Sequence, residues 1–183
     1  VYIVTVTDNV TLCSNSDTIN VIVNPVPATP VIISNPGGTL CQGPLFNFSI
    51  VGPLGPPIVY NWSTGQMGFS INAALVGDYY VVATNQFGCS ATSNILTIHP
   101  LPDLSCVPSG CYEFCDTLAP VTIPGPAGDT GYQWQRLTNT GYVTISTVRY
   151  LTVTQSGSYH LILTNSYGCS SVSAPLDITF VSC

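Results

Sequence analysis

Cysteines are the residues of this chain with the clearest capacity for chemistry. The 183 residues include eight cysteines, none in a CxxC pair and none close to a histidine. Zinc sites need closely spaced Cys and His ligands, whereas dispersed cysteines are typical of disulfides formed in an oxidising compartment. The cysteine pattern therefore predicts a disulfide-bonded protein outside the cell.

The side chains that catalysis requires are sparse. His99 and His160 are the two histidines, and neither lies in a GxSxG or HExxH setting. The eight acids are scattered rather than grouped as in a calcium loop, although a calcium site at a domain joint that uses Asp103 is left open. We expect no catalytic residue, no metal site and no cofactor, and therefore no enzymatic activity.

The charge composition narrows the range of partners. Only 5% of residues are charged, with two arginines and no lysine, and the net charge is -6. Nucleic-acid binding draws its affinity largely from Lys and Arg on phosphates, so this class of partner is excluded. No apolar run approaches the ~20 residues of a membrane-spanning helix. We expect no membrane span in this segment.

An internal repeat organises the chain. The segments VYIVTVTDNVTLCS at 1–14, DYYVVATNQFGCS at 78–90 and SYHLILTNSYGCS at 158–170 share one pattern. We therefore divide the chain into a first repeat at 1–27, which is the C-terminal part of a domain, a complete second repeat at 28–101 and a complete third repeat at 102–183. The start at Val1 without a signal pattern favours a piece of a longer protein.

The repeats are predicted to be β-structures. Tyr79, Val81 and Ala83 alternate with Tyr80, Val82 and Thr84 at a period of two, which indicates a strand with two distinct faces, and frequent Pro and Gly divide the rest into short strands. Trp62 and Trp134 recur in a Tyr-x-Trp phrase and are expected in the core, as are the tyrosines that head the three segments, Tyr2 among them. The expected fold is all-β, with tandem immunoglobulin-like antiparallel sandwiches joined by stiff proline-rich linkers.

Equivalent positions in the repeats predict how the cysteines pair. Cys41 with Cys89, and Cys115 with Cys169, would each close nearly a whole domain and stabilise its thin core. Cys106 and Cys111, five residues apart, would close a small loop. Cys13 and Cys183 would then pair outside this segment.

Two groups of residues are candidates for recognition. Outward apolar residues recur at one strand position, and the surface they form is covered either by a neighbouring copy or by a loop or glycan of the same domain. This candidate interface consists of Ile3, Tyr80, Val82 and Ile162. The segment TGYQWQRLTNTGYVT and its surroundings form a candidate ligand loop with Arg136, Tyr142 and Arg149.

The phrases YNWSTG, DYYVVATNQFGCSATS and LCQG resemble immunoglobulin-like or PKD-like repeats of very large secreted proteins of the Bacteroidota. These include gliding-motility adhesins and other surface proteins exported by the type IX system. The resemblance implies an extracellular, non-enzymatic, adhesive or structural protein. DTI at 17–19 and DTL at 116–118 resemble the O-glycosylation signal of that phylum, a tripeptide that also occurs by chance. The third repeat departs from the pattern, with extra residues between Trp134 and Tyr159.

We thus interpret the chain as a segment of an adhesive stalk or filament at the cell surface, assembled with other copies of itself. The alternatives are a module that binds a glycan or a protein, and a spacer in a secreted enzyme. Glycan binding by the third repeat would favour the module, and fibres in electron micrographs would favour the stalk.

Overall fold

The computed structural model describes residues 1–52 and 58–183, and its regular structure is almost entirely β. A single 3-10 turn, η1 (Asp116–Leu118), accompanies the strands in the described ranges. No helix in those ranges is long and apolar enough to cross a membrane. The all-β immunoglobulin-like class predicted from the alternating sequence is confirmed.

The chain forms two compact units. The first unit comprises Val1–Ile32, Ile50–Phe69 and Tyr80–Asn94, and the second comprises Ile33–Ser49, Ser70–Tyr79 and Ile95–Cys183. The domain limits expected from the repeats remain predictions. Each unit is described in turn.

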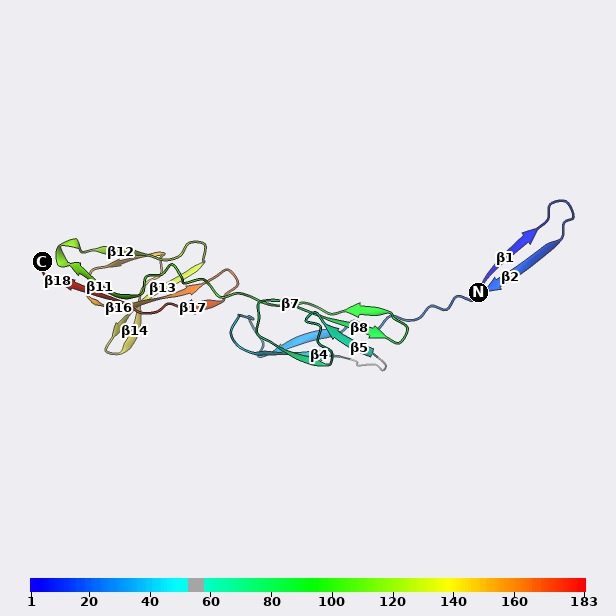
Figure 1. Cartoon of the computed structure of the whole chain (residues 1–183), viewed down its shortest axis with the longest axis horizontal. Coiled ribbons are helices and arrows are strands. Elements are labelled where there is room, and N and C mark those ends of the chain that lie inside the picture. The colour runs from blue at the N-terminus through cyan, green and yellow to red at the C-terminus, as the bar shows by residue number, and fades with distance from the viewer. Residues whose placement is uncertain (53–57) are drawn as a thin grey trace. The chain divides into compact units, whose positions relative to one another are not determined.

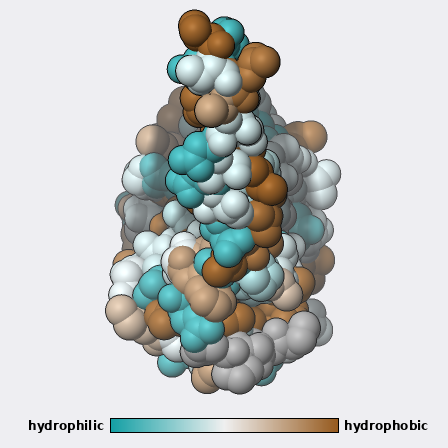
Figure 2. Space-filling view, turned by 90° about the vertical axis from the view of Figure 1, so that its right-hand side faces the viewer, coloured by the Kyte–Doolittle hydropathy of each residue, from teal (hydrophilic) through white to brown (hydrophobic). Residues whose placement is uncertain are grey.

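The first unit begins with a two-stranded antiparallel hairpin. Its strands are β1 (Tyr2–Thr7) and β2 (Ser14–Ile19), with Tyr2 opposite Ile19. Apolar residues lie along one side of the hairpin and polar residues along the other, as the upper part of Figure 2 shows. Tyr2 is 67% exposed, so its expected core position is wrong. Within the described residues β1 pairs only with β2, which leaves the tyrosine ring without a second layer to cover it.

The same unit contains the sheet β5-β8-β9, formed by Ile58–Trp62, Val81–Asn85 and Ser90–Thr92. Val81 and Ala83 are buried, at 0% and 1% exposure, while the residue between them is half-buried. Trp62 is also buried, and its indole Nε1 donates to the carbonyl oxygen of Gly68 at 3.0 Å. The predicted inward face of this strand is confirmed.

Two further strand groups complete the second repeat. The sheet β3-β4-β6 consists of Val31–Asn35, Phe46–Val51 and Ser70–Ala73, and β7 (Gly77–Tyr79) pairs antiparallel with β10 (Leu96–Ile98). The ring of Phe48 meets the ring of Tyr79 edge-on at 5.1 Å between centroids. The Tyr79 hydroxyl donates to the carbonyl oxygen of Leu75 at 2.8 Å, so this tyrosine is buried with its polar atom satisfied.

The third repeat lies in the second unit and forms a sandwich of two sheets (Figure 1). The larger sheet has the order β11-β18-β16-β13-β14, with β17 also paired to β16, and the smaller sheet pairs β12 with β15. The strands of the larger sheet are β11 (Gly110–Cys115), β13 (Gly131–Thr138), β14 (Gly141–Ser146), β16 (Gly157–Thr164), β17 (Ser170–Val172) and β18 (Leu176–Val181). Those of the smaller sheet are β12 (Val121–Pro124) and β15 (Tyr150–Val153).

The core of this sandwich draws on both sheets. Trp134, Leu161 and Leu163 of the larger sheet are completely buried, and they pack with Leu151 and Val153 of β15. Full burial of an aliphatic side chain stabilises a fold by about 1.5–3 kcal/mol. The core position predicted for both tryptophans is confirmed.

One edge of the larger sheet is parallel, which the antiparallel expectation did not include. β11 runs parallel to β18, so that Cys115 lies opposite Val181. In the second repeat, Cys41 forms an isolated parallel bridge with His99. Cys41 and Cys115 therefore each lie close to the last strand of their repeat, where the chain leaves it.

The disulfide pairing predicted from the repeats is wrong. Cys41 bonds to Cys169 and Cys115 to Cys183, while Cys89, Cys106 and Cys111 are free, as is Cys13. The reason is the parallel pairing. Cys41 lies against His99, beside the segment that leaves the second repeat, whereas the Cys89 sulfur lies 3.9 Å from the carbonyl oxygen of Asn24, beside the segment that enters it.

Candidate functional site

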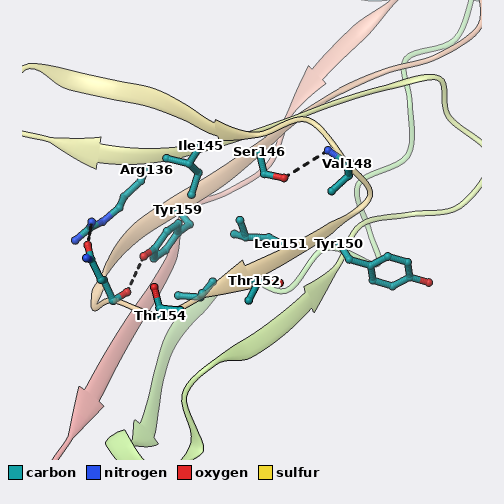
Figure 3. A pocket seen from close by; sticks show the side chains of 11 residues that line it. Arg136, Ile145, Ser146, Val148, Tyr150, Leu151, Thr152, Thr154 and Tyr159 are labelled. Atoms are coloured by element: carbon teal, nitrogen blue, oxygen red, sulfur yellow. Dashed lines mark hydrogen bonds between the residues drawn. The ribbon is translucent and has the colours of Figure 1, made fainter.

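A cavity in the third repeat opens between β13, β14, β15 and β16 and has a volume of about 440 Å³ (Figure 3). Its lining combines one arginine, two tyrosines, aliphatic residues and hydroxyl groups. The lining residues are Arg136, Ile145, Ser146, Val148, Tyr150, Leu151, Thr152, Val153, Thr154, Gln155 and Tyr159. No His, Cys, Asp or Glu is among them, so the cavity offers hydrogen bonds and ring surfaces but no acid, base or thiol.

Arg136 is held in place at one side of this cavity. Its Nη1 donates to the amide oxygen of Gln155, and its Nη2 donates to the carbonyl oxygen of Ser156 at 2.8 Å. The guanidinium carbon lies 6.0 Å from the ring centroid of Tyr159. The buried Nε has no hydrogen-bond partner in the described structure. The guanidinium is therefore pre-oriented, and its Nε donor is unused.

Gly157 makes room for this arrangement. A Cβ atom at Gly157 would lie 2.8 Å from the Arg136 Nε, so any larger residue would displace the guanidinium. The adjoining Tyr159 donates its hydroxyl to the carbonyl oxygen of Gln155 at 2.6 Å. Burial raises the pKa of Tyr159, and the positive charge of Arg136 opposes that rise. The hydroxyl thus stays protonated and works as a donor.

The second predicted ligand residue, Arg149, lines a different cavity of about 410 Å³. Its Nε donates to the carbonyl oxygen of Gly125 at 2.8 Å, and its guanidinium carbon lies 5.0 Å from the Tyr150 ring centroid. Asp103 and Asp129 line the same cavity. Hydrogen bonds from the backbone and hydroxyl of Ser105 lower the pKa of Asp103. No group of three or more His, Cys, Asp or Glu residues able to hold a metal ion occurs among the described residues.

Tyr142, the third predicted ligand residue, stacks on His160, with 3.8 Å between ring centroids. The His160 Nε2 is hydrogen-bonded to the Gln135 amide oxygen at 2.8 Å, and burial lowers the pKa of His160. Arg136, Arg149 and Tyr142 therefore belong to three separate settings, because neighbouring positions along strands face opposite sides of a sheet. Only Arg136 lies in the larger cavity, and the role of the loop as a ligand site remains a prediction.

The candidate interface residues differ in exposure. Ile3 is 67% exposed on the β1-β2 hairpin, and Tyr80, between β7 and β8, is 36% exposed. Val82 and Ile162 are half-buried, and Ile162 lies opposite Val172 of β17. The outward direction expected for Tyr80, Val82 and Ile162 agrees with the burial of the residues next to them, whereas the neighbours of Ile3 are exposed. Contact of these residues with another copy remains a prediction.

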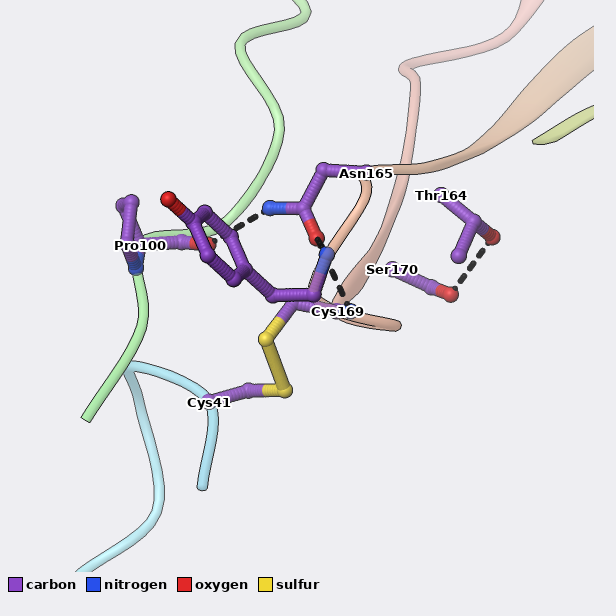
Figure 4. The surroundings of a disulfide bond; sticks show 7 residues. Cys41, Pro100, Thr164, Asn165, Cys169 and Ser170 are labelled. Atoms are coloured by element: carbon purple, nitrogen blue, oxygen red, sulfur yellow. Dashed lines mark hydrogen bonds between the residues drawn. A yellow bond between two sulfur atoms is a disulfide. The ribbon is translucent and has the colours of Figure 1, made fainter. Parts of the chain in front are cut away.

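A second candidate site surrounds the Cys41–Cys169 disulfide, which joins the second repeat to the third (Figure 4). The two Cα atoms are 5.6 Å apart, and Cys169 is completely buried. The Asn165 amide nitrogen donates to the carbonyl oxygen of Pro100 at 2.9 Å. His99 stacks on Tyr167, with the rings 4.2 Å apart and 9° from parallel. A covalent bond, a hydrogen bond and a ring stack thus hold the linker against the third repeat.

The local sequence explains the shape of this turn. In NSYGC at 165–169, the Asn165 side-chain oxygen accepts from the backbone nitrogens of Tyr167 and Cys169, both at 3.1 Å. Gly168 has a φ of 84°, a left-handed conformation that glycine adopts without strain. The sequence reasoning missed Asn165 and the stack of His99 on Tyr167. The recurrence of Asn-x-x-Gly-Cys in two repeats was the available signal.

Comparisons with known proteins give neither a family nor a close relative. No protein-family model matches the chain, and no curated protein matches it. Similar solved structures include extracellular domains 3–5 of Drosophila OTK, at 15% identity and a TM-score of 0.27, covering 78% of this chain and 61% of that one. The Bacteroides ovatus mixed-linkage glucan utilization locus protein SGBP-B, in complex with a mixed-linkage heptasaccharide, is similar at 15% identity and a TM-score of 0.25, covering 97% and 52%. A titin A168–A169 structure is similar at 14% identity and a TM-score of 0.28, covering 82% and 95%.

Proposed function

We propose that the chain is a non-catalytic structural segment of a large extracellular repeat protein, in which it forms part of a stalk or filament at the cell surface. The observation that carries this proposal is the disulfide between Cys41 of the second repeat and Cys169 of the third. A bond inside one domain stabilises only that domain. A bond between consecutive repeats fixes the joint between them, which a load-bearing stalk requires and an isolated binding domain does not.

The surroundings of the bond support the same role. Pro100 stiffens the linker, because its ring fixes the backbone φ angle. Asn165 and Tyr167 contact the linker at Pro100 and His99, so that the joint remains ordered around the disulfide. Disulfides persist in oxidising compartments, which supports a location outside the cytosol. The resemblance to type IX-secreted adhesins of the Bacteroidota favours an adhesive role and attachment at the cell surface.

A second candidate function is a ligand-binding module, and the cavity at Arg136 favours it. An aromatic ring and several hydroxyls are among the groups with which proteins hold sugars and other polar ligands. However, the Nη1 and Nη2 atoms of Arg136 are already engaged by Gln155 and Ser156, and its Nε is buried. The cavity is therefore the weaker of the two candidates.

A glycan array probed with the fluorescently labelled chain separates the two functions. The stalk role predicts no glycan signal that depends on Arg136. The matched control is Arg136→Gln, which keeps a polar amide on a shorter side chain but removes the charge and the guanidinium donors. A signal in the parent chain that disappears in this variant would replace the stalk by a binding module. Fibres or rod-like particles in electron micrographs, unchanged in the variant, would support the stalk.

A further inference from the structure

The turn that contains Cys89 has the same hydrogen bonds as the turn that contains Cys169. The Asn85 side-chain oxygen accepts from the backbone nitrogens of Phe87 and Cys89, both at 3.0 Å. The Asn85 backbone nitrogen donates to the Cys89 carbonyl oxygen at 3.0 Å, and the corresponding distance from Asn165 to Cys169 is also 3.0 Å. NQFGC at 85–89 and NSYGC at 165–169 therefore fold into one structure.

The two turns also contact the preceding linker in the same way. The Asn85 amide nitrogen donates to the carbonyl oxygen of Pro25 at 2.8 Å, as that of Asn165 donates to Pro100 at 2.9 Å. Asn24-Pro25 thus corresponds to His99-Pro100. The Cys89 sulfur lies 3.9 Å from the Asn24 carbonyl oxygen. This contact is independent of the turn itself, and it places the thiol beside the residue that corresponds to His99.

The residue bonded to Cys169, the turn cysteine of the third repeat, indicates what kind of partner Cys89 would have. Beside His99 lies Cys41, in a parallel bridge, with its sulfur bonded to Cys169. Cys169 is completely buried under this bond, whereas Cys89 is free and half-buried. The equivalent site in the same chain therefore shows which group bonds to the turn cysteine, namely a cysteine that forms a parallel bridge with the residue before the linker proline.

We propose that Cys89 forms a second disulfide between repeats. Its partner is a cysteine of the preceding repeat, at the position that Cys41 has in the second repeat. The bond would fix the linker at Pro25 as the Cys41–Cys169 bond fixes the linker at Pro100. The linkers at Pro25 and Pro100 would then be cross-linked in the same way, by a bond from a cysteine in the position of Cys41 to the turn cysteine of the following repeat. The third repeat differs, because its Cys115 bonds to Cys183. This linkage holds whether or not the array serves as a stalk.

The remaining free cysteines have other surroundings. Cys13 is itself a turn cysteine, because the Asp8 backbone nitrogen donates to its carbonyl oxygen at 2.8 Å and the Asp8 carboxylate accepts from the nitrogens of Val10 and Thr11. Cys13 is thus a turn cysteine like Cys89, and it does not occupy the position from which a partner would bond to Cys89. Cys106 and Cys111 belong to the added segment at the start of the third repeat, and neither occupies the position of Cys41.

The bond forms by ordinary thiol oxidation. The two Sγ atoms join, and two protons and two electrons leave. A disulfide compound such as oxidised glutathione accepts both, is cleaved at its own S–S bond and becomes two thiols. The partially exposed Cys89 sulfur is open to this exchange. Oxidised glutathione is therefore the oxidant in the test.

The test is a tandem duplication of residues 26–100 within the full chain, which places a complete second repeat, with its own Cys41, ahead of a second Cys89. After oxidative refolding, peptide mapping should find the Cys41 of the first copy bonded to the Cys89 of the second copy. The number of free thiols should equal that of the parent chain, which has Cys13, Cys89, Cys106 and Cys111 free. The same chain with Ser at the second copy's Cys89 is the matched control and should contain one disulfide fewer.

The proposal is overturned if the first copy's Cys41 remains a thiol, or bonds within its own copy, in a folded chain. If the duplicated chain does not fold, a variant of the 183-residue parent chain provides a second test. Ser166→Gln with Tyr167→Phe converts the NSYGC turn into NQFGC. This variant should retain the bond from Cys41 to Cys169 and the free thiols of the parent. Loss of the bond would show that a turn of the Cys89 sequence does not accept a cysteine, and would equally overturn the proposal.

Discussion

The disulfide between repeats makes a quantitative prediction about mechanical extension. Consider the chain held at its two ends, fully unfolded by force in a non-reducing buffer. The pulling path runs from Val1 to Cys41, across the bond to Cys169, and on to Cys183. When Cys41 and Cys169 are replaced by serine, the bond from Cys115 to Cys183 is the one that shortens the pulling path. The path then runs along the whole segment from Val1 to Cys115.

The double substitution lengthens this path by roughly 60 residues, which is about 200 Å at ~3.3–3.6 Å per residue. Optical tweezers measure such a change in contour length directly. The pairing of Cys41 with Cys89 and Cys115 with Cys169 would instead lose both bonds, and the path would lengthen by roughly 100 residues, about 350 Å. A gain near that larger value, or no gain, would refute the observed pairing.

The same bond should dominate the thermal stability of the joint. Its ends are 128 residues apart in sequence, and the chain-entropy model assigns a loop of that length about 5 kcal/mol of stabilisation. A reductant should therefore lower the melting temperature by many degrees. Addition of a calcium chelator should leave it nearly unchanged, and a large drop with chelator alone would reveal a metal site.

Three further predictions follow from individual contacts. Asn165→Ala removes the side-chain oxygen and the donor to Pro100, and should lower the free energy of unfolding by about 1–3 kcal/mol in a denaturant titration, whereas the exposed Thr140→Ala should change it little. Because burial lowers the pKa of His160, the folded state resists protonation, so stability should be retained above about pH 6.5, decrease as the pH falls from there to the folded-state pKa, and level off below it; an NMR titration midpoint at or above 6.5 would contradict this. Tyr80→Lys with Ile162→Lys should weaken self-assembly in analytical ultracentrifugation without unfolding the chain, and assembly equal to that of the parent would mark these residues as ordinary surface.

Local alternation was sufficient for much of the fold. The period-two pattern around Val81 predicted which residues face inward, and the Tyr-x-Trp phrase placed Trp62 and Trp134 in the core. Which side chains share a face of a strand follows from their alternation along the chain. The exposed Tyr2 was mispredicted for the complementary reason. A side chain is buried only when a second layer covers it, and the hairpin strands of Tyr2 pair with each other alone in the described structure.

The candidate ligand site was only partly accessible from the sequence. The segment around Arg136 was singled out for its aromatic and cationic residues, but the sequence could not show that Arg136, Arg149 and Tyr142 occupy three separate settings. Their separation follows from the register of β13 with β14 and β16, together with the contact of Arg149 with Gly125. Register depends on which strands meet and not on the order of residues within one of them.

The repeated Asn-x-x-Gly-Cys turn, the number of cysteines and the strand alternation are properties of the sequence itself, since each depends on residues a few positions apart. The partner of each cysteine was decided only by the tertiary structure. A disulfide requires two Cα atoms within about 4.4–6.8 Å, whatever their separation in sequence. The parallel pairing of Cys41 with His99 brings that cysteine to the linker that Asn165 and Tyr167 hold, and so Cys169 of the next repeat becomes its partner.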